Sequence, residues 1–118
     1  MMNQFVTVGR MVNNPEIKDL ENGNKVSSIV LAVQRPYKNA EGEYDTDFLD
    51  ITIWNGIAKS TCDYCKKGDL VGVKGRIQNN NYEVDGKTMH KNEMIAEKIT
   101  FLSSNKEKTQ ESDNDLDM

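Results

Sequence analysis

The sequence predicts a mainly β protein, a five-stranded Greek-key barrel with one short helix between its third and fourth strands. Three observations predict it. Apolar and polar residues alternate over much of residues 1–102, which is typical of half-buried strands. Residues 55–68 have helical spacing instead, and the turn signal Asp85-Gly86 lies late in the domain. A five-stranded barrel of another kind would give a similar pattern.

The first two strands are expected at residues 5–12 and 26–35. The two faces of the first strand carry Val6, Val8 and Val12 on one side, and Phe5, Thr7 and Met11 on the other. The turn signal Asn22-Gly23 leads into the second strand. Pro36 is expected to end that strand, because proline lacks the N–H group that a strand ladder needs.

The third strand carries the clearest functional signal. Leu49, Ile51 and Ile53 fall on one face, which is therefore expected to face the core. The opposite face carries two large aromatic residues beside an aspartate and a threonine: Phe48, Asp50, Thr52 and Trp54. A water-soluble monomer gains nothing by displaying such rings, so this face is a candidate binding surface.

One short helix is expected within residues 55–68. Asn55 is its expected N-cap. Lys66 and Lys67 suit the negative end of the helix dipole, and Gly68 suits a left-handed residue after the last turn.

The remaining strands are expected at residues 70–78 and 94–102, with a projecting hairpin arm at residues 82–89. The fourth strand sends Val71, Val73 and Ile77 one way and Lys74 and Arg76 the other. Three strands, one helix, a strand, a hairpin and a closing strand follow the order of the OB-fold, which is the fold we predict.

The 118 residues are expected to form one domain, residues 1–102, and a disordered acidic tail, residues 103–118. The tail has 2 basic and 5 acidic residues, against 13 and 14 in the domain, so it supplies most of the net charge of −4. No apolar run is long enough to span a membrane, and no signal peptide is evident. A cytoplasmic location is therefore expected.

Catalysis and metal binding lack the residues that they require. Two cysteines and one histidine, His90, are too few for a disulfide framework or a usual zinc site. Cys62 and Cys65 have the spacing of a redox motif, but they fall late in the helix, where we expect buried structural residues. Asp45 and Asp47 are expected to be solvated loop acids. We expect no enzyme activity, no cofactor and no metal.

Aromatic residues outside the aliphatic faces indicate a stacking surface; they are Tyr37, Phe48, Trp54 and Tyr82. The candidate cations for backbone contacts are Arg10, Arg35, Lys38 and Lys87. Packing over a strand end would explain any one ring, whereas a stacking surface explains all of them. Single-stranded DNA exposes the faces of its bases, and each stack contributes about 1–3 kcal/mol without reading sequence. The pattern therefore predicts binding to single-stranded DNA.

Several segments closely resemble the bacterial single-stranded DNA-binding protein (SSB) family, in order over residues 1–102. They are Val6-Thr7-Val8-Gly9-Arg10-Met11, Asn14-Pro15-Glu16, Leu31-Ala32-Val33-Gln34-Arg35-Pro36-Tyr37, Asp47-Phe48-Leu49-Asp50-Ile51-Thr52-Ile53-Trp54, Lys66-Lys67-Gly68-Asp69 and Val73-Lys74-Gly75-Arg76-Ile77-Gln78. The resemblance implies an OB-fold and a homotetramer. It also implies a coat on unwound DNA at the nucleoid or replication fork, in replication, recombination and repair. On matching segments, it places the stacking aromatics at the same four positions.

Two departures from the family pattern bear on function. Relatives often carry basic residues before the arm aromatic, where this chain has Asn79-Asn80-Asn81, so we expect a smaller phosphate contribution and weaker binding in salt. Family tails end in acids followed by Ile-Pro-Phe, which docks replication and repair proteins, and this chain lacks Pro-Phe. The candidate partner-binding residues of the tail are Asp113, Asp115, Leu116, Asp117 and Met118. A solubilising tail is the alternative.

Two other functions fit parts of the sequence. The acidic balance and the asparagine run favour an OB-type protein-interaction adaptor at the replication machinery. A small thiol-disulfide oxidoreductase would use Cys62 and Cys65. A subunit interface would border the outer face of the fourth strand, at Leu70, Gly72, Lys74 and Arg76.

Overall fold

The structure is a computed structural model that describes residues 1–104. Within them lie β1 (Phe5–Met11), β2 (Lys18–Asp19), β3 (Lys25–Lys38), β4 (Tyr44–Trp54), α1 (Asn55–Tyr64), β5 (Leu70–Val84) and β6 (Lys87–Ser103). The predicted disordered tail lies outside the described residues from residue 105 onward.

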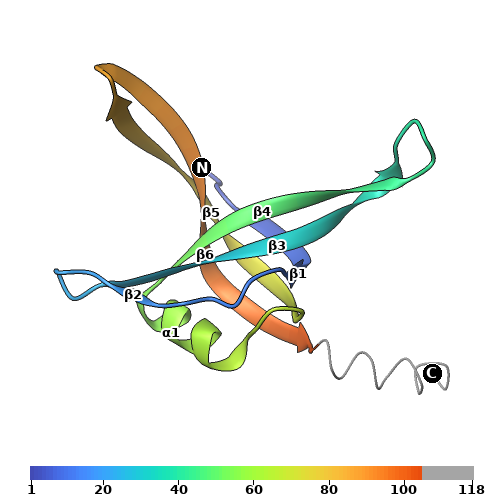
Figure 1. The fold of residues 1–118 in the computed structure, drawn as a ribbon, viewed down its shortest axis with the longest axis horizontal. Helices are drawn as coiled ribbons and strands as arrows, with labels where there is room; N and C mark the ends of the chain where they lie inside the picture. The colour runs from blue at the N-terminus through green and yellow to red at the C-terminus, as the bar shows by residue number, and fades with distance from the viewer. Residues whose placement is uncertain (105–118) are drawn as a thin grey trace.

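The strands close into a five-stranded barrel. Their order is β1-β5-β6-β4-β3-β2, and an additional pairing between β1 and β3 joins the two sides of the sheet. Most pairings are antiparallel, and the one parallel contact joins β4 to β6 at Ile51 and Met94. This is the OB-fold arrangement that the sequence predicted, with α1 between the third and fourth barrel strands (Figure 1). The short β2 is an addition at the edge of β3, and two residues are too few to show a period in the sequence.

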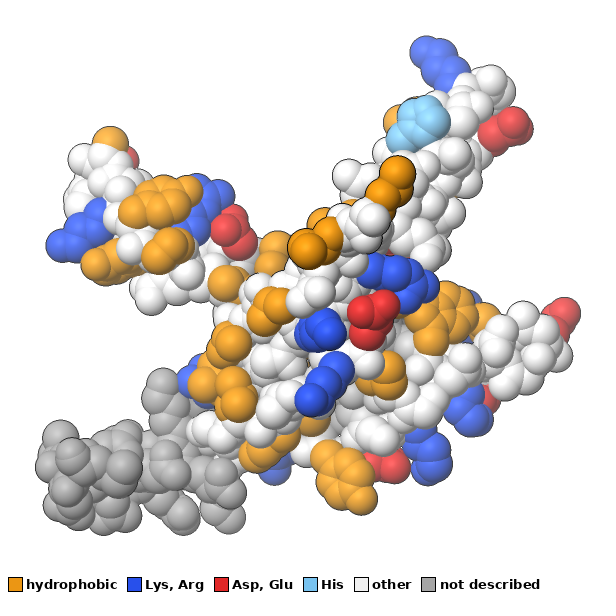
Figure 2. Space-filling view, turned by 180° about the vertical axis from the view of Figure 1, so that it is seen from behind, with side chains coloured by type: hydrophobic (Ala, Val, Ile, Leu, Met, Phe, Trp, Pro, Cys, Tyr) orange, Lys and Arg blue, Asp and Glu red, His pale blue; other side chains and the backbone are white. Residues whose placement is uncertain are grey.

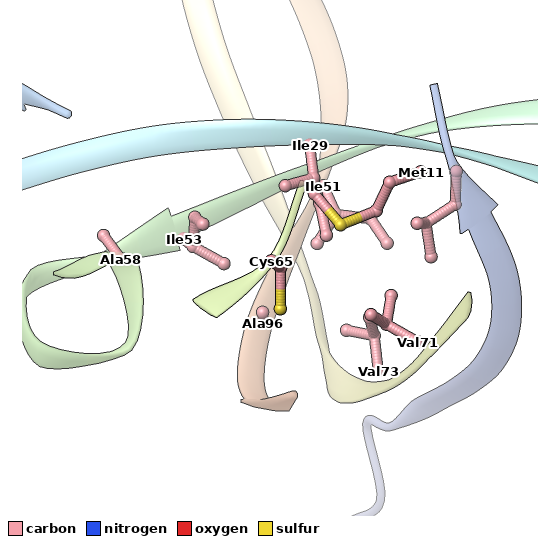
Figure 3. Close-up of a cluster of buried hydrophobic side chains, with 10 residues drawn as sticks. Met11, Ile29, Ile51, Ile53, Ala58, Cys65, Val71, Val73 and Ala96 are labelled. Atoms are coloured by element: carbon pink, nitrogen blue, oxygen red, sulfur yellow. The ribbon is translucent and has the colours of Figure 1, made fainter. Parts of the chain in front are cut away.

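The inward faces of the strands form the core shown in Figure 3. The largest fully buried side chains in it are Met11, Ile29, Leu31, Ile51, Ile53, Val71 and Val73. Burying an aliphatic side chain of this size stabilises the fold by about 1.5–3 kcal/mol. The predicted inward face of the third barrel strand, β4, is therefore confirmed for Ile51 and Ile53, and Leu49 is half-buried.

Two strand predictions were wrong in detail. Pro36 does not end β3, which continues to Lys38 through an irregularity between Gln34 and Lys38. A proline is tolerated there because residues at a bulge need not donate to the ladder. Ile77 does not join Val71 and Val73 inside the barrel but is exposed, because β5 leaves the barrel at this point to form an arm.

The prediction for the helix was also wrong at both ends. Asn55 is not the N-cap: it has a φ of +49°, and its Oδ1 accepts a hydrogen bond of 2.9 Å from the N–H of Lys25. Trp54 occupies the cap position, without a side-chain cap. The helix ends at Tyr64, so the two lysines lie beyond its last turn. Gly68 does adopt a left-handed φ of +96°, but several residues later, where its N–H donates to Met11 O.

Two hairpin arms extend from the barrel (Figure 1). The β3–β4 arm (residues 33–47) continues the antiparallel pairing of β3 and β4. The β5–β6 arm (residues 78–93) reverses at Asp85 and Gly86, both with positive φ, as the Asp-Gly signal predicted.

Candidate nucleic-acid interface

The outer face of β3 and β4 forms a surface that we call the stacking face. Its cross-strand pairs are Val26–Trp54, Ser28–Thr52, Val30–Asp50 and Ala32–Phe48. The residues from β3 are small, so the rings from β4 stand above them. Phe48 is 65% exposed and Trp54 is half-buried. The rings are therefore placed outside the core, where a flat ligand can reach them.

The N-terminal part of β4 adds an aromatic residue that the sequence analysis missed. Tyr44 is 47% exposed and lies on the same face of β4 as Phe48, because side chains four residues apart in a strand point the same way. Extending the period of two back from Phe48 would have found it. Lys38 is paired with Tyr44 across the hairpin, and its Nζ lies 5.8 Å from the centre of the ring. Tyr37, next to Lys38 in β3, is 62% exposed.

Arg35, a predicted DNA contact, is bound to two acids within the β3–β4 arm. Its Nη2 lies 2.8 Å from Asp47 Oδ1 and its Nε 3.0 Å from Asp47 Oδ2, while Asp45 lies 3.6 Å away. The hydrogen bond to Asp47 is the main cause of a raised pKa of Arg35 and a lowered pKa of Asp47. Alternation along β4 places both acids on the opposite face from Phe48. Asp45 and Asp47 are thus an ion-paired cluster in β4, not merely solvated loop acids.

The β5–β6 arm carries Tyr82, which is 45% exposed. The cross-strand pairs on its face of the arm are Gln78–Glu93, Asn80–Lys91, Tyr82–Met89 and Val84–Lys87. Lys87, predicted as a contact, and Lys91, which the sequence analysis missed, are both exposed on this face. The opposite face holds His90, whose Nδ1 lies 2.5 Å from Asn81 Oδ1.

Arg10 on β1 pairs with Ala32 of β3, which in turn pairs with Phe48 of β4, so Arg10 borders the stacking face. Its Nη1 donates a hydrogen bond of 2.8 Å to Gly68 O in the turn that precedes β5. The side chain is half-buried, so its visible role is to hold this turn against the barrel.

Of the two cysteines expected to be buried late in the helix, only one is buried, and it lies directly after the end of α1. Cys65 is buried, and burial is the main cause of a raised pKa of its thiol. Cys62 is half-buried, with its Sγ 3.7 Å from Ser27 Oγ. A raised pKa disfavours the reactive thiolate at neutral pH. Within residues 1–104 there is also no group of three or more histidine, cysteine or acidic side chains placed to hold a metal ion.

Hydrophobic side chains are conspicuous on the β3–β4 arm in Figure 2, where they lie among charged ones. The β5–β6 arm, marked by the pale blue histidine, is mostly uncharged and polar along its length. Among the described residues, no helix is long and apolar enough to cross a membrane.

Comparisons with known proteins agree with this geometry. The model of the "Single-strand binding protein family" matches residues 2–102. A "Single-stranded DNA-binding protein 3" from Listeria innocua is 43% identical over 105 residues, covering 88% of this chain and 66% of that protein. The chain thus spans just under two thirds of that relative's length. The "Single-stranded DNA-binding protein B" of Bacillus subtilis is 40% identical over 103 residues, covering 86% of this chain and 91% of that protein.

A solved structure supports the fold independently. The crystal structure of a deletion mutant of the single-stranded DNA binding protein from Thermus aquaticus superposes with a TM-score of 0.74. It shares 23% sequence identity, and the match covers 86% of this chain and 51% of that one. With a family model that matches nearly all of the barrel and both arms, the chain belongs to the single-strand binding protein family.

Proposed function

We propose that this chain binds and protects single-stranded DNA by stacking unpaired bases on exposed aromatic rings. The observation that carries the proposal is the stacking face, on which Phe48 and Trp54 stand outside the core. An unpaired base buries both its own apolar surface and the ring on contact. Each such stack contributes about 1–3 kcal/mol, and every base can take part.

The distances between rings determine the path of the DNA. Phe48 and Trp54 are six residues apart on β4, or roughly 20 Å at the rise of an extended strand. They therefore hold bases that are not neighbours. The DNA runs across the stacking face and continues onto the arms at Tyr37 and Tyr82. Duplex DNA has no free base faces, so it is bound less well.

Electrostatic attraction makes a modest contribution in this proposal. Arg35 is neutralised by Asp47, and the stacking face itself carries the acid Asp50. Exposed cations beside the rings are Lys18 at Trp54, Lys38 at Tyr44, and Lys87 and Lys91 on the arm that carries Tyr82. We therefore expect a shallow decrease of affinity with salt.

We also propose a homotetramer and a role in replication, recombination and repair. Val6 and Val8 on β1 and Leu102 on β6 are exposed apolar side chains. A side chain placed at Gly72 would contact both Val8 and Leu102, so Gly72, Val8 and Leu102 lie next to one another. Such a patch on a small barrel favours contact with a second copy. The residues 103–118 are proposed to be a separate acidic tail, whose end would recruit partner proteins.

The proposed function is tested by the fluorescence of Trp54, the one tryptophan of the chain. Addition of oligo-dT should quench it, and duplex DNA of equal length should not. A gel shift at low salt should occur with the same oligonucleotide. Unchanged fluorescence together with no gel shift would remove the proposal.

A protein-interaction adaptor is the second candidate, and one observation favours it: acids lie beside the predicted contacts, at Asp47, Asp50 and Glu93. A pull-down with and without residues 109–118 separates the two functions. An adaptor would lose its partners with the tail and show no DNA binding, whereas a DNA coat protein would bind DNA in both forms.

A further inference from the structure

A hollow of about 330 Å³ lies beside Trp54 on the stacking face. It is lined by residues from four strands and the segment before β2, among them Lys18, Val26, Ser28, Thr52, Trp54 and Glu93. Its volume is at the lower end of the range for small-molecule sites, which suits a single nucleobase. An aromatic wall and an apolar residue, Val26, offer contact for the faces of a base, while Glu93 offers a polar group for its edge.

Glu93 is held in position by a neighbouring strand. Its Oε2 accepts a hydrogen bond of 3.1 Å from Thr52 Oγ1, and the side chain is half-buried. Within the described part of the chain, no ion pair joins Glu93 to a cation. A carboxylate has about four acceptor sites and no donor when it is ionised. Thr52 uses one of these sites, so acceptor capacity remains toward the hollow.

We propose that Glu93 makes the base site at Trp54 selective: it favours bases that present an amino group and disfavours thymine. This inference rests on the proposed function and adds a bias at one of several stacking positions. In this site the carboxylate of Glu93 acts as a hydrogen-bond acceptor with a fixed position. Cytosine and adenine present an exocyclic amino donor, and guanine presents two adjacent N–H donors, whereas the N–H of thymine lies between two carbonyl oxygens that a carboxylate repels. Acidic side chains accept hydrogen bonds from the amino group of cytosine in the same way in base readout.

The plainer role for the Thr52–Glu93 hydrogen bond is to join β4 to β6, whose direct pairing is limited to two residue pairs. That role concerns the stability of the barrel and predicts no difference between bases. The two roles are therefore separated by comparing oligonucleotides rather than by affinity alone.

The experiment compares oligo-dC and oligo-dT of equal length, above neutral pH, for the full chain and for Glu93→Gln. The side-chain amide of the variant can donate as well as accept hydrogen bonds, so it also pairs with the carbonyl groups of thymine. The ratio Kd(dT)/Kd(dC) should fall by about three- to tenfold in the variant, the range expected for a hydrogen bond to a charged group that is partly exposed. Loss of a negative charge strengthens binding to both oligonucleotides alike and cancels in this ratio.

Glu97→Gln is the matched control, because it removes the same charge from the same strand. Glu97 is exposed and lies 3.4 Å from Arg76, outside the hollow. The control should leave the ratio unchanged. A second measurement needs no variant: the wild-type chain should bind oligonucleotides of N4,N4-dimethylcytosine less well than oligo-dC, since the methyl groups replace both donors.

The outcomes are distinct. An unchanged ratio in Glu93→Gln, or equal binding of the methylated oligonucleotide by the wild-type chain, would overturn the inference. In either case quenching of Trp54 by DNA would leave the proposed function standing. Absence of both quenching and a gel shift would defeat the proposed function itself.

Discussion

The β3–β4 arm and the β5–β6 arm are both hairpins that continue barrel strands, yet they hold their charges differently. In the β3–β4 arm, Arg35 binds Asp45 and Asp47, so its cation is satisfied within the protein. In the β5–β6 arm, Lys87 and Lys91 are exposed beside Tyr82, and none of the ion pairs of residues 1–104 includes either lysine. A cation near an aromatic residue in sequence is therefore available to a ligand only if no acid faces it across the hairpin.

The largest expected effect concerns how the β5–β6 arm is attached to the barrel. A Cβ atom at Gly75 would clash with Ile95 O and would lie 2.8 Å from the ring of Phe5. Gly75→Ala should therefore lower the free energy of unfolding by about 3 kcal/mol, the upper part of the usual range for overpacking. Chemical denaturation measures this loss. Gly72→Ala is the control, because its Cβ would meet neighbours at 3.7 and 3.9 Å, and equal stability of the two variants would contradict the close approach at Gly75.

The second largest effect is expected from the loss of a stacking ring. Trp54→Ala and Phe48→Ala should each weaken binding to oligo-dT about tenfold, from a loss of 1–3 kcal/mol per stack. Tyr82→Ala tests whether the β5–β6 arm contributes a stack of the same size. Titration with oligo-dT measures all three. Tyr64→Ala serves as the control, since Tyr64 is 79% exposed but lies on α1, away from the stacking face. Unchanged affinity of the first two variants would argue against the path drawn here.

The third effect is the dependence of DNA affinity on salt, which differs between the two arms. Lys87→Gln and Lys91→Gln should each reduce the slope of log K against log salt by roughly 0.7, the value for one neutralised phosphate of a single strand. Arg35→Gln should leave the slope nearly unchanged, because Arg35 is already paired with Asp47. Affinity measured over a series of salt concentrations decides this. A larger slope change for Arg35→Gln than for either lysine would reverse the roles assigned to the two arms.

The smallest effect is the pH dependence of the Arg35–Asp47 pair. The hydrogen bond from Arg35 lowers the pKa of Asp47, so the carboxylate is favoured in the folded state. The pair therefore stabilises the fold above the ordinary aspartate pKa of about 4, and this contribution disappears as pH falls through the lowered pKa. Both side chains are partly exposed, so the change in stability is small. An NMR titration should show that Arg35→Gln raises the pKa of Asp47 toward its ordinary value; no movement would mean that the pair does not form in solution.

Much of the fold was predictable because the alternation of apolar and polar residues along a strand depends only on neighbouring residues in the sequence. Ile51 and Ile53 are buried and Phe48 is exposed, as alternation along one strand requires. The Asp85-Gly86 turn follows equally from residues that tolerate positive φ. The ends of α1 were not predictable in this way, because Asn55 uses its side chain to bind Lys25, a residue thirty positions earlier in the sequence.

For the candidate site, residue types and spacing predicted exposed aromatic residues but missed Tyr44, and they could not rank the cations. Whether Arg35 or Lys91 faces a ligand depends on which side chain lies opposite on the paired strand, and this is a matter of register. The hollow beside Trp54 likewise requires β6 to meet β2, β3 and β4, and β6 is far from these three strands in the sequence. Local alternation predicted most of the barrel strands, the turn of the β5–β6 arm and most of the exposed rings. The tertiary structure decided which charges remain free and where a base can enter, because charge pairing and cavities depend on contacts between distant segments.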